Sequence, residues 1–408
     1  MTGHRLPTPP PEAGGARVWV AEHLGDLTEP VSDPAPAQRG GQQAADAALR
    51  AYDVAGYARR RNDVWPEQRR GSSRLSPYIR HGLLTLREVW DRVAGGPPED
   101  VGKFRDELLW QEYARHLYAR MGTATGRSLR FDVAERAAEP ADPWDAGARC
   151  LESARTELLT TGWLTNQTRM WLASHWSVRH ELGWRDGEDL MYRHLLDGSR
   201  AANRLGWQWS VGALTGKAYG FSRWQVEKRA PGLCATCPLE RACPIADWPA
   251  TQQREPRAAT DPRLRRDDDP ETTAGPAATR RTGDPEAVWL TAESLGDRDP
   301  AAAGHPDLPV IFVFDEPLLR RLRLSANRLV FLTESLAELS TRREVQLWRG
   351  DPVEILAGTR LATTFAPVPG WRSRAARLDV VSLYPWPWLR RPRPGPVTSY
   401  TAWSRARR

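Results

Sequence analysis

The chain has 408 residues, a formal net charge of +7 and 40% hydrophobic residues, enough for one large core or two ordinary ones. No apolar run approaches the roughly 18 to 20 residues of a membrane-spanning helix, and the first residues lack the apolar stretch of a secretory signal. We therefore expect a cytoplasmic, monomeric protein of two domains without membrane contact. Arginine supplies most of the positive charge, which suits a polyanionic partner.

The first half of the chain is predicted to be helical. Residues 1–41 are rich in Pro, Gly and Ala, and we expect an irregular lead-in with one short strand at 18–20. Residues 42–248 carry helical patterns, as in FRDELLWQEYARHL, where Phe104, Leu108 and Tyr113 recur on one face. Residues 249–285 are polar and charged and cannot bury a core, so we predict a disordered linker there.

The last part of the chain has a different pattern. Over residues 286–408 the predicted strands AVWLTA, LPVIFVFD and EVQLWRGDP alternate with helical pieces such as RLVFLTESLAEL. This alternation predicts a small parallel α/β domain, within a chain that is mainly α. The string VWVAEHLGD at 18–26 also recurs as VWLTAESLGD at 288–297, which indicates either a trimmed duplication or a chance similarity.

The cysteines form a second pattern. There are four, Cys150, Cys234, Cys237 and Cys243, and the last three are spaced C-x2-C-x5-C. Disulfides are rare in cytosolic proteins, whereas four thiolates suit a tetrahedral zinc ion or an iron–sulfur cluster. Four unrelated cysteines are the remaining alternative.

Three segments carry a family resemblance: GSSRLSPYIRHG from Gly71, FRDELLWQEYARHL, and the tryptophan-rich stretch 161–212, which contains TGWLTNQTRM and LLDGSRAANRLGWQWS. Together they resemble the flavin-binding core of the photolyase/cryptochrome family, over most of residues 45–230. The resemblance implies an all-helical FAD-binding domain and a small, truncated α/β (Rossmann-like) antenna-type domain. In the family the α/β domain comes first, so the domain order looks permuted, and the antenna chromophore is unknown.

The resemblance also implies a set of cofactor contacts. They are Tyr57, Arg61, Ser72, Ser73, Arg74, Leu75, Ser76, Phe104, Glu107, Gln111, Ala114, Asn166, Arg169, Asp197, Ser199 and Asn203. Small hydroxyl residues before a helix leave donors free for the FAD diphosphate, although such a run alone is an ordinary helix cap. Asp197 would accept a hydrogen bond from the ring, and Asn203 would lie near N5. Ser199 replaces the usual Asp, which removes one negative charge.

Catalytic positions follow from the same motifs. Glu107 and Trp110 share a helix face and would contact a DNA lesion, with Met170 beside it. Trp184 and Trp207 match two steps of the tryptophan chain that reduces the flavin, and spacing does not identify a third. Residues 165–170 contain no histidine that could donate a proton, which favours cyclobutane dimers over (6-4) photoproducts.

The family resemblance therefore implies a deoxyribodipyrimidine (cyclobutane dimer) photolyase that uses reduced FAD and light to repair UV-damaged DNA. The cysteine layout resembles the iron–sulfur branch of the family and implies a 4Fe-4S cluster on the four cysteines. A cryptochrome-like blue-light photoreceptor without repair activity is the alternative, favoured by Ser199 and by Gln111, where the family has Arg. A metal-stapled DNA-binding module without flavin is a third possibility.

Overall fold

The computed structural model describes residues 3–29, 38–133, 142–144, 146–250 and 253–405. The chain divides into two compact units, and each is built from segments that are far apart in the sequence. The α/β unit comprises Met1–Tyr52, Arg74–Arg92 and Asp268–Pro394. The helical unit comprises Asp53–Ser73, Val93–Asp267 and Gly395–Arg408. The units therefore do not follow the predicted succession of a helical and an α/β domain.

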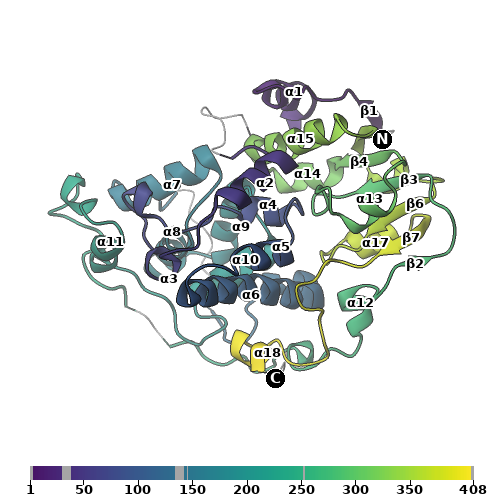
Figure 1. Cartoon of the computed structure of the whole chain (residues 1–408). Coiled ribbons are helices and arrows are strands. Elements are labelled where there is room, and N and C mark those ends of the chain that lie inside the picture. Colours follow the sequence, from purple (N-terminus) through teal and green to yellow (C-terminus); the bar gives the residue numbers. More distant parts are fainter. Residues whose placement is uncertain (1–2, 30–37, 134–141, 145, 251–252, 406–408) are drawn as a thin grey trace. The chain divides into compact units, whose positions relative to one another are not determined.

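The α/β unit contains a seven-stranded mixed sheet of order β1-β5-β4-β3-β6-β7-β2 (Figure 1). Its strands are β1 (His4–Leu6), β2 (Arg280–Arg281), β3 (Ala287–Leu290), β4 (Val310–Asp315), β5 (Val345–Gly350), β6 (Leu361–Thr364) and β7 (Val380–Tyr384). The five inner strands are parallel, and β1 and β2 pair antiparallel at the edges. Counted from β3, the inner order is 3-2-1-4-5, as in doubly wound sheets. The predicted strands coincide with β3, β4 and β5. Strands β3 and β4 are almost continuously apolar, as expected of buried parallel strands.

The helices of this unit are α1 (Gly15–Leu24), α2 (Gln42–Ala51), α4 (Ser76–Arg80), α5 (Leu86–Arg92), α12 (Pro270–Ala274), α13 (Pro300–Gly304), α14 (Glu316–Leu322), α15 (Ala326–Ser340), α16 (Pro352–Ile355) and α17 (Trp371–Ala375). The short strand predicted at 18–20 is wrong, because these residues belong to α1. Trp19 and Val20 are buried together with Ala16 and Leu24, at the spacing of one helix face. The Trp19 ring packs on Phe314 of β4, with 5.7 Å between the ring centroids.

Two further expectations are corrected. The string at 18–26 lies in a helix and its counterpart begins in strand β3, so the two similar strings are not a structural repeat. The described part of the predicted linker also has structure: a 3-10 turn at Pro262–Leu264, helix α12 and strand β2, with Leu264 and Ala274 buried. A few apolar side chains and the pairing of β2 with β7 are enough to order this polar segment.

The helical unit contains α3 (Tyr57–Arg60), α6 (Pro98–Met121), α7 (Arg149–Thr161), α8 (Asn166–Ser174), α9 (Trp184–His194), α10 (Arg200–Ser210), α11 (Arg223–Arg229) and α18 (Tyr400–Arg405). A π-helical turn, His175–Arg179, extends α8. Trp144, Trp171, Trp184 and Trp207 are among the largest fully buried side chains, and they lie in one core cluster. None of the described helices is long and apolar enough to cross a membrane.

Candidate functional site

Arg169 and Asp197 form the best-defined pair among the predicted flavin contacts. The Thr165 hydroxyl accepts a hydrogen bond from the Thr168 amide and caps α8, so Arg169 lies in the first turn of that helix. Its Nη2 donates to Asp197 Oδ2 at 2.8 Å. The second oxygen, Oδ1, is buried and has no hydrogen-bond partner among the described residues. One buried carboxylate oxygen is therefore available to a donor that the chain itself does not supply.

Asn203 belongs to a buried charge network that the sequence analysis missed. Its Nδ2 donates to Glu188 Oε1 at 2.8 Å, and the Glu188 side chain is fully buried. Arg185 and Arg200 donate to the other oxygen, and Arg204 lies 3.6 Å from it. The i, i+3 spacing of Arg185 and Glu188 on α9 was a signal for this network, but the contacts from α10 depend on tertiary packing. The network holds α9 against α10.

Four of the predicted contacts meet where α3 faces α6. The Tyr57 and Phe104 rings pack edge to face, with centroids 4.9 Å apart. Arg61 Nε lies 3.5 Å from Glu107 Oε1, and Lys103 Nζ lies 3.1 Å from the same oxygen. Glu107 is partly exposed and thus lies between two cations. On the same helix Gln111 is half-buried and Ala114 is buried.

The predicted diphosphate-binding run crosses the boundary between the two units. Ser72 and Ser73 belong to the helical unit, whereas Arg74, Leu75 and Ser76 belong to the α/β unit. Arg74 has a left-handed backbone with φ 56°, and Leu75 is fully buried. Ser72 Oγ is buried without a hydrogen-bond partner in the described part of the chain, which leaves a hydroxyl for a ligand.

One face of the Trp110 ring is covered by another aromatic ring. The ring of Tyr400, the first residue of α18, stacks on it with 4.0 Å between centroids and 10° between planes. The Tyr400 hydroxyl donates to the carboxylate of Asp106, one turn before Trp110. Nothing in the local sequence around either aromatic residue indicated this contact.

Met170 and Asn166 lie on the exposed side of α8. The Asn166 side chain is exposed, and its Nδ2 lies 3.6 Å from the Met170 sulfur. Ser199 is the residue before α10, with an extended backbone at φ −121°, and its side chain forms no cap to that helix.

The tryptophans predicted to carry electrons are buried. Trp184 begins α9 and Trp207 lies on α10, and neither indole N–H has a hydrogen-bond partner among the described residues. A further tryptophan, Trp176 in the π-helical turn, packs on Trp144 with centroids 5.2 Å apart. The sequence did not indicate this contact between Trp144 and Trp176, because the two residues come from a loop and a helix that are far apart along the chain.

All four cysteines line one small cavity of about 20 Å³. Burial, followed by the neighbouring thiols of Cys234, Cys243 and Cys237, raises the pKa of Cys150 to about 12. The Arg149 amide donates to the Cys237 sulfur at 3.4 Å. Within the described ranges no three Cys, His, Asp or Glu side chains are arranged as a finished metal site. The donor set nevertheless fits a soft metal in its chemistry, because four thiols line the same cavity.

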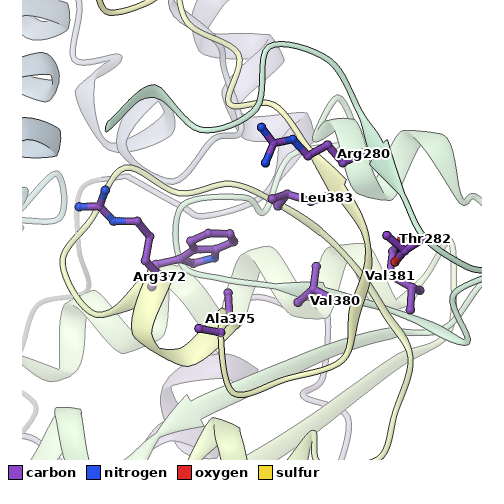
Figure 2. A pocket seen from close by; sticks show the side chains of 9 residues that line it. Arg280, Thr282, Arg372, Ala375, Val380, Val381 and Leu383 are labelled. Atoms are coloured by element: carbon purple, nitrogen blue, oxygen red, sulfur yellow. Dashed lines mark hydrogen bonds between the residues drawn. The ribbon is translucent and has the colours of Figure 1, made fainter. Parts of the chain in front are cut away.

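A larger cavity of about 310 Å³ lies in the α/β unit, where α17 faces β2 and β7 (Figure 2). Trp371, Ala375, Val380 and Leu383 supply its apolar lining. Two arginines on its lining are already engaged: Arg280 with Glu271, and Arg372 with the Thr272 carbonyl at 2.8 Å. None of the predicted flavin contacts lines this cavity.

Part of the helical unit is similar in sequence to known proteins. Residues 104–228 match the family model described as the FAD binding domain of DNA photolyase. A deoxyribodipyrimidine photo-lyase of Thermus thermophilus is 34% identical over 223 residues, which cover 52% of this chain and 50% of the relative. The corresponding protein of Synechococcus is 32% identical over 190 residues, 42% of this chain and 38% of the relative. Residues 104–228 are thus similar to the FAD binding domain of DNA photolyases.

The sequence motifs and these matches agree in their similarity to the photolyase/cryptochrome family, over at most 52% of the chain. It spans about half the length of the curated relatives that it matches. Among solved structures, a Synechocystis cryptochrome aligns with a TM-score of 0.44 and 20% identity, over 49% of this chain and 46% of that chain.

Proposed function

We propose that this chain is a flavin-dependent photolyase that repairs cyclobutane pyrimidine dimers in UV-damaged DNA. The observation that carries the proposal is the buried, unpartnered Asp197 Oδ1 beside Arg169, inside a segment that matches a photolyase FAD-binding domain. A carboxylate oxygen buried without a donor is costly, so a ligand N–H is the natural partner. When bound and reduced, FAD would supply the light-excited electron that splits the dimer.

The chain's own residues have distinct roles in this proposal. Arg169 orients the Asp197 carboxylate, and Ser72 offers its free hydroxyl to the diphosphate. Glu107, held between Arg61 and Lys103, would accept a hydrogen bond from a base edge. Trp110 would stack on the flipped lesion, and Met170 on the exposed side of α8 would pack against it.

We further propose a 4Fe-4S cluster held by Cys150, Cys234, Cys237 and Cys243, with zinc as the alternative. The convergence of four thiols on one cavity supports this set. The ligands close a loop from α7 to the segment after α11, so a bound metal would stabilise the helical unit by restricting the unfolded chain.

Flavin binding and repair are tested separately. Asp197→Asn removes the charge of the free acceptor and should weaken FAD binding about tenfold or more, since hydrogen bonds to charged groups are worth about 1.5–3 kcal/mol. Asp186→Asn, on an exposed carboxylate of α9, is the matched control. FAD affinity is read from flavin fluorescence on titration of the apoprotein. Unchanged affinity in Asp197→Asn would contradict the assignment.

Repair is measured as the loss of dimers from an oligonucleotide under blue light with reduced flavin. A protein that binds FAD but leaves dimers intact would instead be a cryptochrome-like photoreceptor. The stacking of Tyr400 on Trp110 is the specific observation that favours this second function, because it covers the aromatic face that a lesion needs.

A further inference from the structure

Helix α18, in the segment of residues 395–405, lies beside α6 (Figure 1). Its first residue, Tyr400, covers one face of the Trp110 ring. The Tyr400 ring lies parallel to the indole at 4.0 Å between centroids, and its hydroxyl is held by Asp106. This is the parallel arrangement in which a nucleic-acid base stacks on an aromatic side chain. Trp110 therefore cannot bind Tyr400 and a base on the same face at once.

The segment is anchored on both sides of Tyr400. Before it, Tyr113 Oη donates to the Val397 carbonyl at 3.0 Å, and Arg120 Nη1 donates to the Gly395 carbonyl at 2.8 Å. After it, the buried Trp403 donates from Nε1 to His116 Nδ1 at 2.9 Å. Val397 and Trp403 are only 1% and 3% exposed. These buried anchors hold the backbone in place.

Tyr400 itself is less constrained. Both it and Trp110 are half-buried, and Asp106 is partly exposed with Lys103 3.3 Å away as a second partner. When the Tyr400 side chain swings away, it gives up ring contacts with Trp110, Tyr113 and Trp403 and the hydrogen bond to Asp106, while the buried side chains of Val397 and Trp403 keep their places.

We propose that Tyr400 is an internal gate that occupies the stacking position on Trp110 in free protein and leaves it when a DNA base enters. The inference rests on the proposed function, since it assumes that the lesion stacks on Trp110. Its consequence is a competition between Tyr400 and the dimer for the Trp110 ring. The free energy needed to displace Tyr400 lowers the affinity for the dimer, whereas undamaged DNA, which does not stack on Trp110, does not meet this cost.

The test is the binding of a single-stranded oligonucleotide with one cyclobutane thymine dimer, measured in the dark by fluorescence anisotropy against the undamaged strand. Tyr400→Ala should bind the dimer about three- to tenfold more tightly than the natural chain, because one aromatic pair no longer competes. Affinity for the undamaged strand should not change. Tyr400→Phe keeps the ring and should show a smaller gain. Trp224→Ala, on an exposed tryptophan of α11, is the control.

A second measurement reads the Tyr400 ring itself. In protein labelled with fluorotyrosine, the 19F resonance that is missing in Tyr400→Phe should shift towards that of a solvent-exposed ring when dimer DNA binds, and should stay unchanged with the undamaged strand. If the natural chain prefers dimer DNA but Tyr400→Ala binds it equally or more weakly, Tyr400 is not a gate, and the proposed function stands. If neither protein prefers dimer DNA although both bind FAD, the proposed function fails, and the gate fails with it.

Discussion

Trp176 and Trp207 converge on one point of helix α9, the Cα of Gly187. A Cβ added to Gly187 would lie 2.3 Å from an atom of the Trp207 ring and 2.9 Å from an atom of the Trp176 ring. Glycine in the middle of a helix costs about 1 kcal/mol relative to alanine. The close approach of the two indoles to α9 explains why a glycine occupies this position despite that cost, since a larger residue would meet both rings.

This relationship predicts opposite effects for two glycine substitutions. Gly187→Ala should lower the free energy of unfolding by about 1–3 kcal/mol, because overpacking outweighs the gain in helix propensity. Gly206→Ala on α10, where an added Cβ meets nothing within 4 Å, should raise it by up to about 1 kcal/mol. Urea unfolding monitored by circular dichroism measures both. A stabilised Gly187→Ala protein would show that the rings do not lie as described.

The buried network around Glu188 predicts a large loss of stability. Glu188→Gln removes the negative charge from a site with Arg185, Arg200 and Arg204, and should cost about 3 kcal/mol or more because three largely buried cations lose the one fully buried carboxylate that they share. Asp189→Asn is the control, because this carboxylate contacts two of the same arginines but is 38% exposed. Its cost should stay below about 1 kcal/mol. Equal costs for the two variants would argue against a buried network.

His175 predicts a pH dependence of stability. Burial, and then the neighbouring His180 and Arg179, lowers the pKa of His175 to about 3. Its Nε2 lies 3.0 Å from His180 Nε2. The unfolded chain binds the proton near pH 6.5 and the folded chain only near pH 3, so stability is full above pH 6.5 and falls as the pH drops towards 3.

The slope contributed by His175 is about 1.4 kcal/mol per pH unit within that window. In His175→Gln, whose side chain cannot take up a proton, the free energy of unfolding should fall less steeply between pH 6 and pH 4. Thermal unfolding at a series of pH values measures the difference. Parallel curves for the two proteins would assign the acid sensitivity to other groups.

From the cavity lined by the four cysteines we predict a bound metal that is lost when one thiol is removed. Cys150→Ser should abolish stoichiometric iron or zinc in the purified protein and lower its melting temperature, because the link between α7 and the segment after α11 is lost. Ala235→Ser, an exposed change between Cys234 and Cys237, should leave both unchanged. Elemental analysis identifies the metal. Full metal content in Cys150→Ser would remove that thiol from the ligand set.

The relation between sequence and structure differs from motif to motif. The short-range patterns were informative: the helical period of α6, the continuous apolar runs of β3 and β4, and the flavin motifs all follow from neighbours a few residues apart. The expectation of a strand at 18–20 failed because three apolar residues in a row fit either a strand or one face of a helix.

By itself, the sequence determined the similarity to the photolyase/cryptochrome family, the placement of the matching motifs on helices, and the set of four cysteines, because each depends on residue types in the sequence. Only the tertiary structure decided that both units interleave along the chain, that Gly187 admits two tryptophan rings, and that Tyr400 covers Trp110. The physical reason is distance along the chain: these contacts join segments from tens to hundreds of residues apart, and their free energy comes from packing that no local pattern encodes.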